Sequence, residues 1–185
     1  TVTVSEPNQH TKVDTERQVT SYTEGEGRPS IARLADGGFV VAWELLGGPH
    51  RIHAQRYTAD GNKNGDMIVV SDTSLYPQYS SLKEQPAVTG LANGGFVVAW
   101  EAFEWEQGMG GSGNGEDASH IDVQIFDANG QKVGTKFAAN SNDVGLQWGA
   151  SIAGLANGEF VVTWNTNGHA STPGFSGQRF GANGT

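Results

Sequence analysis

One phrase occurs three times along this chain, and it limits the possible folds more than any other feature. The copies end in Phe39-Val-Val-Ala-Trp43, Phe96-Val-Val-Ala-Trp100 and Phe160-Val-Val-Thr-Trp164, so they lie 57 and 64 residues apart. Spacings of this size are typical of repeated β units such as propeller blades. An Asp-Gly or Asn-Gly pair precedes each copy, and Gly supplies the positive φ that a tight hairpin turn needs. The phrase therefore predicts a β-hairpin in each of three units.

The sequence predicts further strands after each hairpin. The third strand is expected at residues 52–57, 121–126 and 175–180, and the fourth strand at residues 67–71 and 136–140. The third unit has no fourth strand of its own, whereas residues 12–20 resemble residues 132–140. We therefore predict that residues 12–20 supply the fourth strand of the last unit, a closure that hides exposed strand edges.

The repeated strand is apolar on both faces. Side chains alternate along a strand, so Phe39, Val41 and Trp43 share one face, while Val40 and Ala42 share the other. Such a strand is buried on both sides, as in stacked blades, and the repeated Trp residues are expected in the core. We predict an all-β fold of three four-stranded repeats arranged as propeller-like blades, with a β-trefoil or another pseudo-threefold β fold as the alternative.

The repeats are expected to form a single domain. It would cover residues 1–185, with units of approximately 12–65, 66–134 and 135–185, the last of them closed by the N-terminal strand. Propellers typically have 4 to 8 blades. Three units therefore predict either a homodimer, or further copies in a longer chain, or closure into another threefold barrel.

Composition disfavours several classes of function. The chain of 185 residues has a formal net charge of −9, which argues against binding to the phosphates of nucleic acid. It has no Cys, so it offers neither disulfides nor a thiolate metal site. Its apolar stretches are too short for a transmembrane helix, and membrane insertion is not expected.

The full repeat pattern resembles a known family. Pro-x-Ile-x-x-Leu-x-[Asp/Asn]-Gly-Gly-Phe-Val-Val-Ala-Trp is followed by Ile-x-x-Gln-x-[Tyr/Phe]-x-Ala-[Asp/Asn]-Gly and then by Val-Gly-x-x-Phe. Over residues 12–185 this pattern is similar to the propeller-type repeats of large secreted bacterial proteins, including RTX-type surface proteins and adhesins. The resemblance implies a propeller-like fold, a secreted or cell-surface location, and a role in binding or spacing. It brings no catalytic residues with it.

A polar turn is a candidate calcium site. Asp60, Asn62, Asn64 and Asp66 lie at alternate positions, as do the oxygen ligands of calcium loops. An EF-hand would also need Glu at residue 71, which is Ser71. The alternative is a hairpin turn rich in Asn and Gly.

A long insertion at residues 102–120 is a candidate sugar-binding loop. It contains Phe103, Glu104, Trp105 and Glu106. Aromatic faces stack on sugar rings, and carboxylates bond their hydroxyl groups. The alternative is a flexible loop, because the insertion is rich in Gly and Ser.

The residue after each repeated Trp forms a third candidate set. Glu44, Glu101 and Asn165 are expected at one rim of the fold. Together with Glu104 and Glu106, Glu101 could provide the paired carboxylates of a glycosidase; the alternative is that these residues solvate strand ends. Each unit also has one histidine in the loop after the Trp strand: His50, His120 and His169. Together they could bind a metal, but they occupy different positions in their loops, which argues against a shared site.

The sequence therefore predicts an extracellular binding module that is not an enzyme. It would recognise a glycan or another surface polymer, with calcium as a cofactor. The first alternative is a structural, self-associating repeat of a large adhesin. The second is a glycosidase or polysaccharide lyase.

Overall fold

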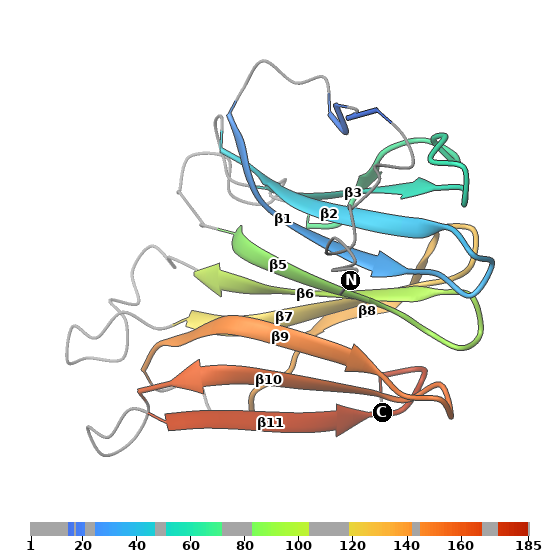
Figure 1. The fold of residues 1–185 in the computed structure, drawn as a ribbon. Coiled ribbons are helices and arrows are strands. Elements are labelled where there is room, and N and C mark those ends of the chain that lie inside the picture. Colours follow the sequence, from blue (N-terminus) through green and yellow to red (C-terminus); the bar gives the residue numbers. More distant parts are fainter. Residues whose placement is uncertain are drawn as a thin grey trace, which may run out of the picture.

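The computed structural model of this protein is an all-β structure of three antiparallel sheets (Figure 1). It describes residues 15–16, 18–20, 25–46, 51–71, 83–103, 119–141, 145–167 and 174–184. The first sheet contains β1 (Glu26–Arg33), β2 (Phe39–Leu45), β3 (Arg51–Tyr57) and β4 (Ile68–Val69). The second contains β5 (Lys83–Gly90), β6 (Phe96–Phe103), β7 (Ser119–Phe126) and β8 (Lys132–Ala138), and the third β9 (Gln147–Gly154), β10 (Phe160–Thr166) and β11 (Gly174–Phe180).

In each sheet the strands follow one another in chain order, so each unit is a meander. The predicted hairpins and third strands are confirmed. Fourth strands are found too, at 68–69 where 67–71 was expected and at 132–138 where 136–140 was expected. Each fourth strand stays with the sheet before it, and the sheets span 26–69, 83–138 and 147–180. None of the described residues forms a helix long and apolar enough to cross a membrane.

The hairpin turn explains the repeated Gly-Gly pair. Gly37 has a φ of 89°, which L side chains rarely adopt. A Cβ on Gly38 would lie 2.2 Å from the carbonyl oxygen of Tyr57. The second unit repeats this arrangement at Gly94 and Gly95. The first Gly therefore makes the turn, and the second lets the end of the third strand approach it.

The three sheets stack face to face in one consistent orientation. Val40 and Ala42 of β2 pack with Phe96, Val98 and Trp100 of β6 in one core cluster. The other face of β6 packs on the third sheet in a second cluster, which contains Val97, Ala99, Phe160, Val162 and Trp164. Each Phe-Val-Trp face thus covers the Val-Ala face of the sheet before it. The prediction that the repeated tryptophans lie in the core is confirmed, since Trp43, Trp100 and Trp164 are 4%, 0% and 7% exposed.

The first strands of the sheets are in backbone contact. A Cβ on Gly90 of β5 would lie 2.1 Å from the carbonyl oxygen of Arg33 in β1, and a Cβ on Gly154 of β9 would lie 2.4 Å from that of Gly90. Hydroxyl groups add bonds between sheets, because Thr89 Oγ1 accepts a hydrogen bond from Gly154 N at 2.9 Å. Gly at these positions therefore permits the close stacking of β1, β5 and β9 (Figure 1).

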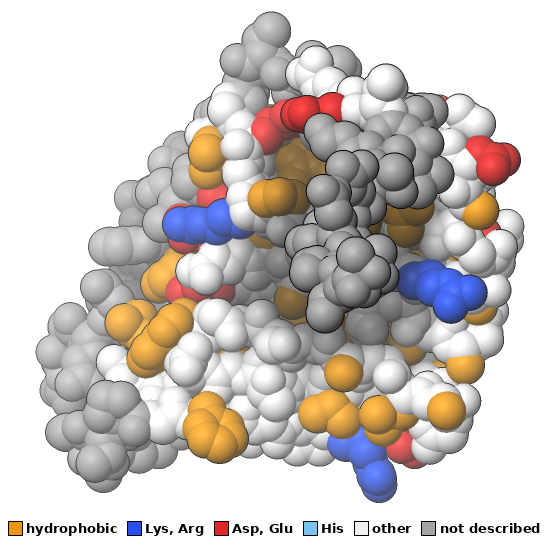
Figure 2. Space-filling view, in the orientation of Figure 1, with side chains coloured by type: hydrophobic (Ala, Val, Ile, Leu, Met, Phe, Trp, Pro, Cys, Tyr) orange, Lys and Arg blue, Asp and Glu red, His pale blue; other side chains and the backbone are white. Residues whose placement is uncertain are grey.

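The two end sheets of the stack differ. The outward face of β2 is covered, with Trp43 and Tyr57 both buried. On the outward face of the third sheet Thr163 and Asn165 are exposed, and Phe175 of β11 is 85% exposed. Figure 2 shows hydrophobic side chains scattered, not gathered in one patch, over this end of the molecule, at the bottom of the view. Burial on both faces therefore holds for the repeated strands of the first two sheets and not for the third.

The predicted closure by residues 12–20 is not found in the described part of that segment. Residues 15–16 and 18–20 form no strand. The other residues of the segment lie outside the part of the chain that the structure describes. Tyr57 Oη donates a hydrogen bond to the carbonyl oxygen of Val19 at 3.0 Å, which places Val19 at the first sheet. The third sheet has three described strands, and among the described residues the sheets do not close into a ring.

Candidate functional site

A β-bulge interrupts the first strand of each sheet, opposite the repeated Trp. The residue in the bulge has a positive φ, which is 50° at Arg28, 50° at Gln85 and 64° at Gly149. In a non-Gly residue this conformation costs about 1–2 kcal/mol. Arg28 and Gln85 therefore hold strained backbone that the surrounding sheets keep in place.

The bulge directs a side chain to the residue after the Trp. Arg28 Nη1 donates to Glu44 Oε2 at 3.1 Å, and Gln85 Nε2 donates to Glu101 Oε2 at 3.1 Å. Arg28 Nη1 also reaches across to the second sheet and pairs with Glu84 Oε2 at 2.5 Å. We call Arg28, Glu44, Glu84 and Glu101 the carboxylate cluster. It joins the first and second sheets with three carboxyl groups and one guanidinium group.

Glu101 is the group of this cluster with a strongly shifted pKa. Burial, and after it the nearby negative charge of Glu84, raise the pKa of its carboxyl to about 7, against the opposing effects of Arg28 and the backbone N–H of Gly149. The side chain is only 4% exposed. Near neutral pH the carboxyl of Glu101 is therefore present in both its protonated and its ionised form.

The structure brings together two of the three residues predicted to share a rim. Glu44 and Glu101 meet in the carboxylate cluster, whereas Asn165 lies in the third sheet, where its Nδ2 donates to Trp148 O at 3.4 Å. Phe103 ends β6 and is half-buried. His120 Nε2 lies 3.3 Å from Asp122 Oδ1. The other candidates lie outside the described residues; they are Glu104, Trp105, Glu106, His50 and His169.

The candidate calcium turn joins β3 to β4. Thr58 N donates to Asn62 O at 2.8 Å, and Asn64 N donates to Arg56 O at 2.9 Å. The side chains of Asp60, Asn62 and Asp66 are exposed. No group of three or more His, Cys, Asp or Glu residues suited to a metal is found within the described ranges. Calcium binding by this turn stays a prediction.

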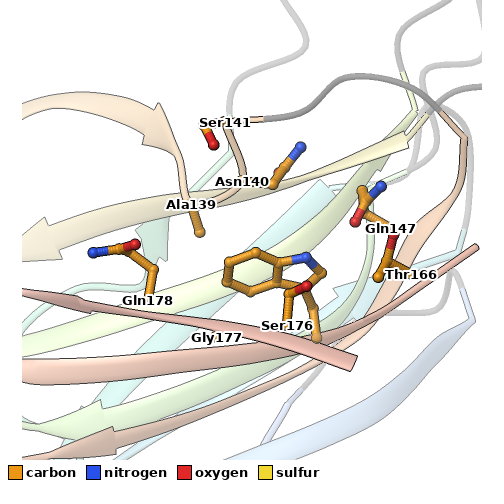
Figure 3. Close-up of a pocket in the computed structure, with 9 residues that line it drawn as sticks. Ala139, Asn140, Ser141, Gln147, Thr166, Ser176, Gly177 and Gln178 are labelled. Atoms are coloured by element: carbon orange, nitrogen blue, oxygen red, sulfur yellow. The ribbon is translucent and has the colours of Figure 1, made fainter. Parts of the chain in front are cut away.

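A pocket of about 370 Å³ lies between the end of β8 and the third sheet (Figure 3). Its lining combines three amides, three hydroxyl groups, an indole and two small residues: Asn140, Gln147, Gln178, Ser141, Thr166, Ser176, Trp164, Ala139 and Gly177. Figure 3 shows Gln147 and Thr166 at one end and Gln178 at the other. We call this the amide pocket.

The walls of the amide pocket are fixed by hydrogen bonds to the second sheet. Asn140 Oδ1 accepts a bond from Ile121 N at 2.9 Å. Ser119 Oγ donates to Gln147 O at 2.7 Å and accepts from Gln147 N at 2.8 Å. Asn140 and Gln147 are accordingly buried, while Ser176 and Gln178 on β11 are exposed. The pocket thus has a rigid floor and an accessible rim.

A comparison of the repeats explains why this junction is open. In the second sheet the partner of Trp100 on the next strand is Asp122, which is ion-paired with Lys136 of β8 at 2.7 Å. In the third sheet the partner of Trp164 is the shorter Ser176. The described part of the third sheet also has no strand in the place of β8. The smaller side chain and the missing neighbour leave space beside the indole.

Sequence reasoning missed this pocket. It assigned Trp164 to the core only and gave no role to Asn140, Gln147, Ser176 or Gln178. One sequence difference could have indicated the pocket. At the position that pairs with the repeated Trp, the second unit has Asp122 and the third unit has Ser176.

Comparisons with known proteins show similarity of fold. No protein-family model and no curated protein sequence matches this chain. A solved Hadza microbial sialidase matches 82% of this chain and 34% of its own length, at 11% identity and a TM-score of 0.62. An endo-arabinase from Bacteroides thetaiotaomicron matches 88% of this chain and 59% of its own length, at 16% identity and a TM-score of 0.55. The chain spans less than two thirds of either protein.

Proposed function

We propose that this chain is a carbohydrate-binding module built from propeller-type blades, and that the amide pocket is its binding site. The observation that carries this proposal is the indole of Trp164 in a pocket of amide and hydroxyl groups. An aromatic face stacks on the apolar face of a sugar, and amides both donate to and accept from its hydroxyl groups. The fold shared with a sialidase and an endo-arabinase supports a carbohydrate-related role. The module would act outside the cell.

Variants at the pocket rim test binding without disturbing the core. Gln178→Ala and Ser176→Ala each remove hydrogen-bonding groups worth about 0.5–1.5 kcal/mol, so each is expected to weaken sugar binding about 2- to 12-fold. Thr163→Ala is the matched control, because Thr163 is exposed on the opposite face of β10 and its loss is expected to leave affinity unchanged. Isothermal titration calorimetry with a panel of oligosaccharides measures this.

The same titration is run with calcium and with EDTA. The absence of binding to every glycan, with and without calcium, would refute the binding proposal.

We propose that calcium bound by Asp60, Asn62, Asn64 and Asp66 stabilises the module. EDTA is therefore expected to lower the melting temperature of the wild type in a thermal unfolding experiment, and Asp60→Asn is expected to abolish that difference.

The second candidate function is glycoside hydrolysis at the carboxylate cluster. Glycosidases use a carboxylic acid of raised pKa beside a second carboxylate, and Glu101, with a pKa of about 7, lies near Glu84 and Glu44. If the chain hydrolyses arabinan or a sialylated glycan, Glu101→Gln is expected to lower the rate more than about 100-fold. Glu159→Gln, at the β9–β10 turn, is the control and should retain full activity. A wild-type chain that cleaves neither polymer would exclude this candidate and leave the binding proposal intact.

A further inference from the structure

We infer that the amide pocket selects an uncharged sugar unit and rejects acidic sugars such as sialic and uronic acids. This inference rests on the proposed function and specifies its ligand class. The lining of the pocket contains amide, hydroxyl and aromatic groups, and its described residues include no charged side chain. A sugar carboxylate that enters loses water, and the described lining offers no cation to compensate that loss.

The two cations of β8 do not face the pocket. Lys132 pairs with Phe126 of β7, which packs towards the first sheet. Lys136 of β8 lies 2.7 Å from Asp122 Oδ2, and Asp122 alternates with Ile121 and Val123, which face the third sheet. The Lys136–Asp122 pair therefore lies on the side of the second sheet that faces away from the pocket.

The cation of β11 also faces away. Arg179 follows Gln178 directly, so its side chain lies on the opposite face of the strand. Its Nε lies 3.5 Å from Glu159 Oε2. The net charge of −9 on the whole chain repels an acidic ligand further.

The size of the pocket limits the ligand to a short segment. Its volume of about 370 Å³ lies at the lower end of the range of about 300–1,000 Å³ for small-molecule sites. This volume suits about one or two sugar units. The pocket is therefore expected to bind the end of a sugar chain or a single sugar unit. A carboxyl group on that unit is expected to weaken binding.

Matched sugar pairs test this selectivity directly. Glucose is compared with glucuronic acid, galactose with galacturonic acid, and lactose with sialyllactose, with the intrinsic tryptophan fluorescence of the intact chain as the readout. We expect the acidic member of the best-binding pair to bind at least about 10-fold more weakly than the neutral member. Equal or tighter binding of the acidic member would overturn the inference and leave the binding proposal standing. If no member of any pair binds, the inference falls, and the oligosaccharide panel decides the binding proposal separately.

A charge introduced at the rim provides the second arm of the test. Gln178→Lys adds a cation to the pocket and is expected to improve binding of the acidic sugar about 5- to 10-fold. Phe175→Lys is the matched control, because it adds the same charge to the same strand on the opposite face, where Phe175 is 85% exposed. The same gain from both variants would mean that overall charge, not the pocket, sets the preference, and would overturn the inference.

Discussion

Replacement of Gly90 by alanine is expected to lower the free energy of unfolding by about 3 kcal/mol or more. The new Cβ would lie 2.1 Å from the carbonyl oxygen of Arg33 and 3.2 Å from its carbonyl carbon. Both are backbone atoms of β1, which cannot move aside as a flexible side chain can. The first two sheets would have to separate, which would also stretch the bond from Val88 N to Ser30 Oγ. Urea denaturation followed by tryptophan fluorescence measures the loss.

Gly174→Ala is the matched control for this substitution. Gly174 begins β11, and a Cβ there would have no atom within 4 Å. Its replacement is expected to change stability by less than about 1 kcal/mol. Gly154→Ala, whose Cβ would lie 2.4 Å from Gly90 O, should behave like Gly90→Ala. If all three variants were equally stable, the first strands would not be in backbone contact.

The second large effect is a loss of stability as the pH rises towards neutrality, caused by Glu101. The folded chain raises the pKa of this carboxyl from 4.5 to about 7. Between these two values the folded state keeps the proton and the unfolded state does not, so this contribution is complete below pH 4.5 and is lost as the pH rises through 7. At about 1.4 kcal/mol per pKa unit, the contribution of this one group is on the order of 3 kcal/mol.

Glu101→Gln isolates this effect from other titrations. Burial lowers the pKa of His53, so His53 works in the opposite direction and stabilises the fold as the pH rises through 6.5. The advantage of the glutamine variant over the wild type is therefore the quantity to measure, at pH 5 and at pH 8. We expect this advantage to grow by about 2.5 kcal/mol between the two, because a small part of the effect is already lost at pH 5. An advantage that is constant with pH would contradict the shifted pKa of Glu101.

Much of the fold could be predicted from the sequence because each unit repeats its local signals. Pairs such as Asp36-Gly37 mark the hairpins, and the two-sided apolar strand predicts stacking. The bulge at Arg28 and Gln85 was not recognised, although each precedes a proline, because the conformation becomes necessary only when the strands pair. The closure by residues 12–20 rested on similarity to a strand, and similarity does not say which sheet edge a segment meets; Val19 lies at the first sheet.

The site was less predictable than the fold. Glu44 and Glu101 could be expected to meet because they occupy the same place in consecutive units. The amide pocket depends instead on how β8 of one sheet lies against β11 of the next, a relation between units that no single repeat contains. A difference such as Ser176 in place of Asp122 gains meaning only once these strands are seen together.

The most direct test of the proposed carbohydrate site is an NMR titration that follows the indole N–H groups of the chain. A neutral sugar is added to the ¹⁵N-labelled protein, and Trp164→Phe assigns the pocket resonance. The indole resonance of Trp164 is expected to shift with saturation, while those of Trp43 and Trp100, which are buried away from the pocket, stay in place. An unchanged Trp164 resonance at saturating sugar, or shifts confined to other tryptophans, would contradict the assignment of the amide pocket as the binding site.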